Sequence, residues 1–380
     1  MKITLPDDVK QIIETLEQHG YEGYAVGGCV RDSILGRIPN DWDITTSATP
    51  QQVKKLFLRT VDTGIQHGTV TVLMGKEGYE VTTYRVDGEY EDARHPKEVT
   101  FTANLEEDLR RRDFTINAMA MDEHGAITDL FGGREDLSRR AIRCVGEPET
   151  RFREDALRML RAYRFAAQLG FSLDAQTQAA IRRCAPLCAS LSRERVREEA
   201  EKTLLSDRPE YFGRMLAEGL LGACIRAENA DFSGLSALPK TPEARWTAAK
   251  LRCPAFDPAA FRLPAKLCRL IELTAQTWRE GRTEAEWKRL IAEHGWETAH
   301  LQADMQRTDI VRQIETRGDC VTLRQLAVTG ADFPTLCGKD VGRMLHLLLV
   351  YALEHPDQNT KTQLLAAAPS LWQEENKIQG

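Results

Sequence analysis

The sequence predicts an α+β protein: a head with a small mixed or antiparallel sheet, followed by an all-helical neck, body and tail. Three observations predict this fold. Segments rich in β-branched residues, broken by glycine and proline, are confined to about the first third of the chain. Beyond about residue 150, helical periodicity dominates to the end. At 380 residues the chain is too long for one typical core, so several domains are expected.

The first predicted element is an amphipathic helix over residues 7–19, because Val9, Ile12, Ile13 and Leu16 share one helical face. Short β-branched or apolar segments then predict strands. They lie at residues 24–28, 40–46, 68–74, 79–85 and 98–101. The glycines and the proline between these segments favour a small, mostly antiparallel sheet.

A long helix is predicted over residues 151–171 from its repeating apolar side chains. A linker rich in proline, glycine and serine interrupts the helical region near residues 231–242. We therefore expect four parts, the head, neck, body and tail. Their predicted bounds are 1–142, 143–205, 206–315 and 316–380.

Composition excludes several classes of protein. The chain has no run of about 18 apolar residues, and its charged start is not a secretory signal, so we expect a cytoplasmic protein with no membrane partner. The nine cysteines are scattered and never form a C-x-x-C pair, which argues against a disulfide framework or a zinc site. The net charge of −6 does not by itself favour nucleic-acid binding.

One stretch departs from this acidic balance. Residues 139–202 contain fourteen Lys and Arg against nine Asp and Glu, a local net charge of +5. Such a stretch can attract a phosphate backbone. It is equally consistent with a solvated helical face carrying i,i+4 ion pairs. Charge alone leaves both interpretations open.

The most informative motif is YAVGGCVRDSILGRIPNDWDITT, at residues 24–46. On a strand, Asp41 and Asp43 project to the same side. Two neighbouring carboxylates repel each other unless cations share them, and Mg²⁺ commonly binds one or two protein carboxylates together with substrate phosphates. The pair therefore indicates a magnesium site, although a solvated strand edge is the simpler alternative.

The same motif carries a candidate phosphate site. Gly27 and Gly28 lack a Cβ, so backbone N–H groups can approach a triphosphate at the start of the next helix. Arg31 would add positive charge there. An ordinary turn explains two glycines equally well, but their position just ahead of the carboxylate pair favours a nucleotide site.

A third carboxylate is a common part of two-metal chemistry. Glu80 lies on the predicted strand 79–85, with Thr82 on its own face, and is one candidate. Asp113 is the other, although it follows three arginines and could instead anchor them. The sequence leaves this choice open.

Acidic and basic residues recur every three positions along the predicted helix 151–171, as Asp155, Arg158, Arg161 and Arg164. Residues three apart are neighbours on a helix, so Asp155 and Arg158 would present an acceptor and a donor side by side. Such a pair can read a base edge and exclude G and U. An intrahelical salt bridge is the ordinary alternative. Arg161 and Arg164 turn progressively away and are expected to hold phosphate or RNA.

These motifs resemble those of the class II tRNA CCA-adding enzymes and bacterial poly(A) polymerases. The resemblance covers GG, RD and DWDITT near the start, RRDFTINAMA at 111–120, EDALRMLRAYRF at 154–165 and SRERVREEAEKTLL at 192–205. It implies that Gly28 and Arg31 hold a triphosphate and that Arg112 orients the nucleotide. It also implies that Asp155 and Arg158 select the base.

The resemblance further implies an activity: addition of C, C and A to the 3′ end of tRNA from CTP and ATP, with Mg²⁺ on Asp41 and Asp43. The neck would select the nucleotide, and the tail would bind tRNA. The protein could act as a monomer or as a homodimer. Poly(A) polymerase and partial (CC- or A-adding) enzymes share these motifs. More remote alternatives are a nucleotidyltransferase acting on a small molecule or protein, and a non-catalytic RNA-binding protein.

Two further segments extend the resemblance. Residues 85–101 are similar to the family loop DGxYxDxRRPxxVxF, with His95 where the pattern has its second arginine. The presence of this loop favours full CCA addition over an A-only relative. Residues 323–356 are similar to the C-terminal helical segment of the Gram-positive-type enzymes.

Overall fold

The computed structural model describes residues 4–87, 99–225 and 230–378. The chain divides into two compact units, Met1–Ser233 and Gly234–Gly380, and each is described by itself. The predicted loop with His95 lies largely in 88–98, outside the described residues. The four-part division into head, neck, body and tail stays a prediction.

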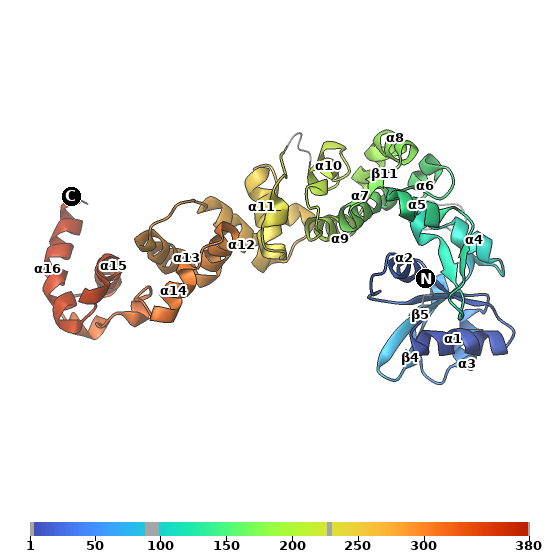
Figure 1. The fold of residues 1–380 in the computed structure, drawn as a ribbon. Helices are drawn as coiled ribbons and strands as arrows, with labels where there is room; N and C mark the ends of the chain where they lie inside the picture. Colours follow the sequence, from blue (N-terminus) through green and yellow to red (C-terminus); the bar gives the residue numbers. More distant parts are fainter. Residues whose placement is uncertain (1–3, 88–98, 226–229, 379–380) are drawn as a thin grey trace. The chain divides into compact units, whose positions relative to one another are not determined.

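The first unit is built on a seven-stranded sheet in the order β3-β4-β5-β2-β1-β8-β9 (Figure 1). The strands are β1 Gly23–Val26, β2 Asp43–Thr46, β3 Thr60–Gly64, β4 Thr69–Met74, β5 Glu77–Thr83, β8 Met119–Met121 and β9 Ile127–Asp129. Only β2 and β5 pair in parallel, and the other neighbours are antiparallel. The predicted mixed, mostly antiparallel sheet is confirmed.

Short helices cover this sheet: α1 Asp7–Gln18, α2 Gly28–Ile34, α3 Pro50–Leu56, α4 Leu105–Arg110 and α5 Gly133–Arg139. The helices α1 and α3 lie side by side (Figure 1). The four apolar residues predicted to share one face of α1 are all fully buried. Strands β6 Arg85–Asp87 and β7 Val99–Phe101 form a separate two-stranded ribbon.

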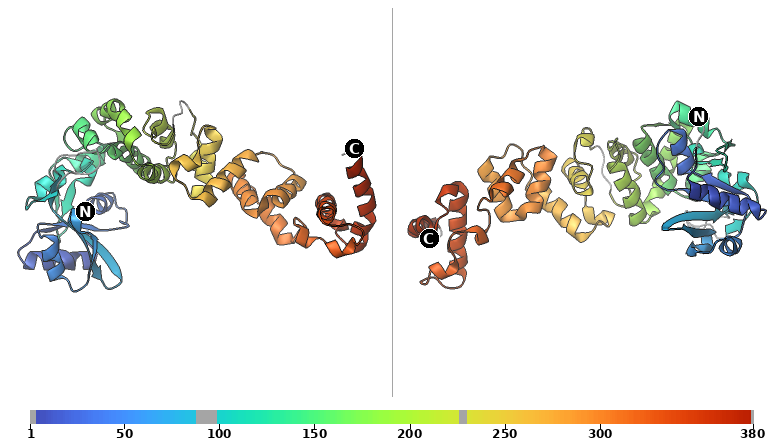
Figure 2. Two further views of the ribbon diagram at one scale, coloured as in Figure 1. Left: turned by 180° about the vertical axis from the view of Figure 1, so that it is seen from behind. Right: turned by 60° about the horizontal axis from the view of Figure 1, so that its bottom comes forward.

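Helices fill the rest of the first unit: α6 Pro148–Glu154, α7 Leu157–Leu169, α8 Ala175–Cys184, α9 Arg193–Leu204 and α10 Tyr211–Ala217. Before α6 and after α7, β10 Ala141–Ile142 and β11 Ser172–Leu173 pair in parallel. Beyond β11 the described chain contains helices and turns but no further strand (Figure 2).

The prediction of one continuous helix over 151–171 was wrong. The chain breaks at Asp155, whose φ of −144° and ψ of 105° are extended, between α6 and α7. The Asp155 carboxylate accepts a hydrogen bond from the backbone N–H of Leu157 at 3.0 Å. Aspartate competes in this way with helical hydrogen bonding, and so it favours helix ends over helix interiors.

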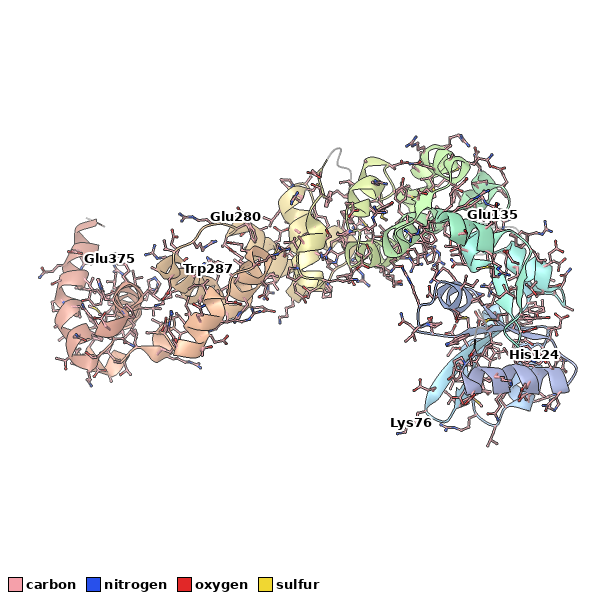
Figure 3. The ribbon with its side chains drawn as sticks, in the orientation of Figure 1. Lys76, His124, Glu135, Glu280, Trp287 and Glu375 are labelled. Carbon is pink, nitrogen blue, oxygen red and sulfur yellow. The ribbon has the colours of Figure 1, made fainter. Side chains whose placement is uncertain are left out.

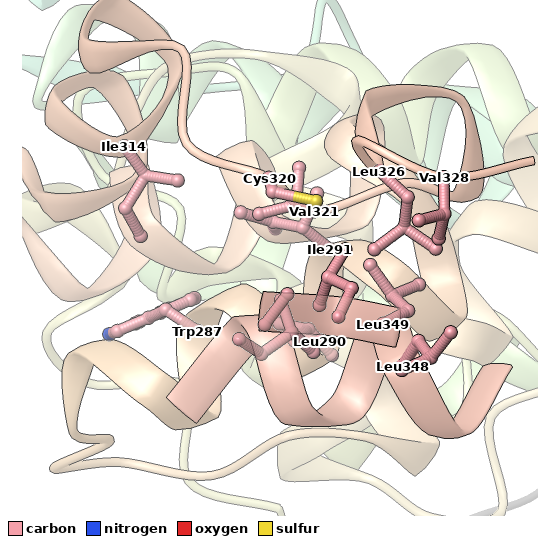
Figure 4. Close-up of a cluster of buried hydrophobic side chains, with 14 of the residues drawn as sticks. Trp287, Leu290, Ile291, Ile314, Cys320, Val321, Leu326, Val328, Leu348 and Leu349 are labelled. Carbon is pink, nitrogen blue, oxygen red and sulfur yellow. The ribbon is translucent and has the colours of Figure 1, made fainter. Parts of the chain in front are cut away.

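The second unit is helical, with α11 Pro242–Arg252, α12 Ala265–Gln276, α13 Glu284–Gln306, α14 Ile310–Arg317, α15 Lys339–Glu354 and α16 Lys361–Ile378. Figure 4 shows an apolar cluster of this unit, where Leu290 and Ile291 of α13 lie beside Leu348 and Leu349 of α15. Trp287, labelled in Figure 3, belongs to the same cluster. No described helix is long and apolar enough to cross a membrane.

Candidate active site

The carboxylates meet at the start of β2. Strand β2 begins at Asp43, so Asp41 approaches from the preceding loop and not from the strand that the sequence predicted. The parallel register pairs Ile44 with Val81, and one step earlier in this register Glu80 lies alongside Asp43. Burial removes water from the Asp43 carboxylate, and the negative charges of Asp41 and Glu80 act on the same group. Both effects favour the protonated form and raise the pKa of Asp43 to about 6.

Repulsion among these acidic groups is the condition under which a bound cation is stabilising. Among the described residues, no three His, Cys, Asp or Glu side chains form a complete metal cluster. Asp41 and Asp43 could supply two oxygen ligands, with substrate phosphates and water as the others, which is the ligand set that Mg²⁺ commonly uses. The donor set therefore fits a hard divalent ion that is shared with a phosphate substrate.

The glycine turn lies beside two guanidinium groups. Gly27 has φ of +83° and ψ of −126°, a conformation that favours glycine, and it immediately precedes α2. A Cβ on Gly27 would lie 3.2 Å from Arg112 Nη1, and a Cβ on Gly28 would lie 3.7 Å from Arg31 Nη2. The structure thus brings the predicted phosphate residues Gly28 and Arg31 together with Arg112, which was predicted to orient the nucleotide.

Both arginines are held from behind. The Nε and Nη2 of Arg31 donate to Asp32 at 2.9 Å each, and its Nη1 donates to Asn117 Oδ1 at 2.7 Å. Arg112 Nη2 donates to the fully buried Asp108 at 3.2 Å. Arg112 Nε is buried and has no hydrogen-bond partner, as expected where a ligand acceptor is still to be received.

Of the two candidates for a third carboxylate, only Glu80 lies beside Asp43. Asp113 accepts hydrogen bonds from Phe114 N at 2.8 Å, Asn117 Nδ2 at 3.2 Å and Arg161 Nε at 2.7 Å. Burial alone would raise the pKa of Asp113, but Arg161 and these hydrogen bonds outweigh it and lower the pKa to about 2. Asp113 therefore anchors Arg161, and not the three preceding arginines that the sequence suggested as its partners.

The predicted base-reading pair is not a pair in this structure. Asp155 Oδ2 is 2.7 Å from Arg195 Nη2. Arg158 Nη1 donates to Glu154 at 2.6 Å, and its Nη2 donates to the Arg111 carbonyl at 3.0 Å. Because Asp155 is extended and lies ahead of α7, the helical i,i+3 geometry that the sequence suggested does not apply to the two residues.

Arg161 and Arg164 converge with Arg31 around one aromatic ring. The three guanidinium carbons lie 5.3, 4.2 and 5.2 Å from the centroid of Phe165. Arg164 is also 2.7 Å from the buried Glu199. Helix α7 is thereby joined to α2, and three cations face one region of the first unit.

Sequence reasoning missed several residues that hold the site, namely Asp108, Asn117, Phe165, Arg195 and Glu199. Asp108 carried a signal, because it lies three and four positions before Arg111 and Arg112 on a short helix. Asn117 and Arg195 carried none, because their partners are distant in sequence.

The chain matches two family models. One is described as the poly A polymerase head domain and covers residues 23–143. The other is described as the probable RNA and SrmB-binding site of polymerase A and covers residues 170–224. The fold and the carboxylate site together define the class: a nucleotidyltransferase with a poly(A) polymerase-type head. Enzymes of this class generally use divalent metal ions.

Similar proteins narrow the class. A CCA-adding enzyme of Lactobacillus helveticus is 58% identical over 191 residues, 50% of this chain and 48% of that protein. One of Geobacillus kaustophilus is 48% identical over 262 residues, 69% and 62%. These alignments span about half to two thirds of the curated relatives. The crystal structure of the Bacillus stearothermophilus CCA-adding enzyme with CTP matches with a TM-score of 0.78 and 34% identity, over 97% of this chain and 98% of that one. The chain belongs to the CCA-adding enzyme family.

Proposed function

We propose that this protein adds C, C and A to the 3′ end of tRNA without a nucleic-acid template, using CTP and ATP. The observation that carries the proposal is the convergence of Asp41, Asp43 and Glu80 near the Gly27–Gly28 turn. It stands in a chain whose fold matches a CTP-bound CCA-adding enzyme over nearly its whole length. The nine cysteines are all free, in keeping with a reducing, cytoplasmic setting.

Each residue has a proposed part. Mg²⁺ held by Asp41 and Asp43 would neutralise the triphosphate and activate the tRNA 3′-hydroxyl for in-line attack on the α-phosphate, which forms the new phosphodiester bond and releases pyrophosphate. A second metal ion would stabilise the leaving pyrophosphate. Glu80 adds negative charge beside Asp43 and is the proposed third carboxylate. Gly28 lets the backbone approach the triphosphate closely, Arg31 balances its charge, and Arg112 orients the nucleotide.

Base selection is proposed for Asp155 and Arg158. An ionised carboxylate accepts from the exocyclic amine of C or A, and a guanidinium donates to the neighbouring ring acceptor. In this structure the two groups bind Arg195 and Glu154, so reading a base requires them to share or exchange these partners. Arg161 and Arg164 are proposed to hold phosphate or RNA, and the tail is proposed to bind tRNA mainly through its phosphates.

Poly(A) polymerase is the second candidate, and the head-domain model that matches residues 23–143 favours it. A partial CC- or A-adding enzyme would use the same side chains. These alternatives differ only in product, so product analysis separates them. Whether the protein acts as a monomer or a homodimer stays open.

The test is to incubate the protein with Mg²⁺, CTP, ATP and a tRNA lacking its 3′ end, and then to sequence the products. Products that end in CCA and are not extended further support the proposal. A ladder of A residues, or arrest after CC, would replace it by one of the alternatives. Absence of incorporation into any RNA would overturn it.

A matched pair of variants ties the activity to the site. Asp41→Asn removes one proposed ligand charge and is expected to abolish incorporation. Asp62→Asn makes the same change at an exposed β3 carboxylate whose partner is Lys54, at 2.8 Å, and is expected to leave the products unchanged. Equal activity of the two variants would contradict the assignment of Asp41.

A further inference from the structure

Asp108 lies where several functional segments of the first unit meet. It is in α4, its side chain is fully buried, and no part of the site described above assigns it a role in the reaction. A buried carboxylate is costly unless it is paired and hydrogen bonded. The four groups that satisfy Asp108 belong to residues that surround the nucleotide site.

The first of these groups is Arg112. Asp108 Oδ2 accepts from Arg112 Nη2 at 3.2 Å. The other terminal nitrogen of the same guanidinium, Nη1, lies over Gly27. Asp108 therefore holds one side of a planar cation whose other side faces the phosphate turn. Burial would raise the pKa of Asp108, but Arg112 and Arg111 outweigh it and lower the pKa.

The second group belongs to the strand that carries the metal carboxylate. Thr45 Oγ1 lies 3.3 Å from Asp108 Oδ2 and 3.2 Å from the Thr82 carbonyl oxygen, so its single proton is shared between these two acceptors. Thr45 lies two residues after Asp43, so both project from the same face of β2. One carboxylate oxygen thus contacts both Arg112 and the strand of Asp43, and it fixes the distance between the triphosphate cation and the metal-binding carboxylate.

The other oxygen reaches the base-selecting side of the site. Asp108 Oδ1 accepts from Arg111 Nε and Nη2 at 2.9 and 2.8 Å, and from Arg85 N at 3.4 Å. The Arg111 carbonyl in turn accepts from Arg158 Nη2 at 3.0 Å. Arg85 begins β6, the strand that leads into the predicted loop.

We propose that Asp108 is a positioning residue, which sets the place of Arg112 relative to Asp43 and so aligns the triphosphate with the metal site. This inference rests on the proposed nucleotidyl transfer and extends it to a side chain that does not itself touch the nucleotide. Positional errors of about 1 Å at such groups cost on the order of 100-fold in rate, so a positioning role is measurable in kinetics.

The test is Asp108→Asn, which keeps the side-chain shape and removes the charge. The KM for CTP and for ATP is expected to rise by about ten-fold or more, because a charge-assisted hydrogen bond to the positioned cation is lost. The KM for tRNA and the order of C and A addition are expected to stay unchanged. A merely structural role would instead lower the active fraction and leave both nucleotide KM values as they were.

Asp136→Asn is the matched control. Asp136 is also a buried aspartate of the first unit, and it accepts from Thr115 Oγ1 at 2.5 Å and Arg143 Nε at 2.9 Å. Thermal denaturation of the two variants gives the stability cost of losing one buried charge. A rise in nucleotide KM in Asp108→Asn alone supports the inference, whereas an equal rise in both variants overturns it.

Thr45→Val keeps the inference testable if Asp108→Asn does not fold. Valine has nearly the shape of threonine and removes only the hydroxyl, so nucleotide KM is expected to rise by a smaller factor in the same direction. Unchanged KM in Thr45→Val together with unchanged KM, or no fold, in Asp108→Asn overturns the inference. A wild-type protein that incorporates no nucleotide would instead indicate failure of the proposed function.

Discussion

The first unit and the second unit differ in the charged side chains that they bury. Both have apolar cores, and in the second unit α13 to α16 share one apolar cluster. Around the site, the first unit also buries charged groups such as Arg31, Asp108, Asp113 and Arg158, each paired with an opposite charge. The comparison indicates that charge pairs hold geometry near the chemistry, within a unit whose fold rests on apolar packing as the second unit's does.

The largest expected effect is on activity and comes from the first unit. Asp43→Ala should lower nucleotide incorporation by at least about a thousand-fold, since a metal ligand contributes several kcal/mol to transition-state stabilisation. The thermal midpoint should change little, because the substitution removes a carboxylate that Asp41 and Glu80 repel. Incorporation rates and thermal melts check this, and a collapse in melting temperature would show that Asp43 serves the fold.

The next effect is on stability and comes from the second unit. Leu348 is fully buried in the apolar cluster, so Leu348→Ala should lower the free energy of unfolding by about 3 kcal/mol. Urea denaturation measures this change. Leu323→Ala, at a residue that is 45% exposed in the same unit, should cost less than about 0.5 kcal/mol. CTP binding should survive in both variants, and its loss in Leu348→Ala would contradict the separation of the two units.

A third prediction concerns the ion pair of Asp113 with Arg161. The folded-state pKa of Asp113, about 2, lies below its ordinary value of 3.8, so the pair stabilises the fold above about pH 4 and this contribution is lost as pH falls toward 2. Asp113→Asn should therefore lose about 2 kcal/mol at pH 7 and progressively less at lower pH. Denaturation at several pH values measures the difference, and a gap independent of pH would exclude the ion pair as its cause.

The smallest expected effect comes from adding one methyl group to a glycine of the first unit. Gly27→Ala and Gly20→Ala place alanine at nearly the same φ, +83° and +81°, but the ψ of −126° at Gly27 is essentially confined to glycine, so alanine there costs more, about 1–3 kcal/mol. A Cβ at Gly20 meets nothing within 4 Å, whereas one at Gly27 meets Arg112. Stability should fall in both variants and further in Gly27→Ala, and only Gly27→Ala should raise the KM for CTP, by about ten-fold. Equal KM values would show that Arg112 yields freely.

Local patterns predicted much of this molecule. The apolar period of residues 7–19 predicted α1 and its buried face, and β-branched segments between glycines predicted β4 and β5. Strand alternation kept Glu80 as a candidate for the third carboxylate. The register that lays Glu80 beside Asp43 could not be read from the sequence, because it depends on which strands pair.

The remaining features depend on contacts between residues that are distant in sequence. Apolar residues continue through 151–171, so periodicity alone extended the helix across Asp155, and only the side-chain hydrogen bond to Leu157 N explains the break. The hydrogen-bonded residues Asp155 and Arg195 are forty positions apart in the sequence, and Arg31 and Asn117 are eighty-six positions apart. Such partners come together only when the chain folds, so no local sequence pattern predicts them.

The pairing of β10 with β11 limits which changes in length the segment between the two strands can accept. Their hydrogen bonds join the two ends of the segment that contains α6, the break at Asp155 and α7. One residue inserted into α7 ahead of Arg161 would turn the helix beyond it by about 100° and carry Arg161 away from Asp113. The contacts of α7 therefore depend on the number of residues between β10 and β11 as well as on their identity.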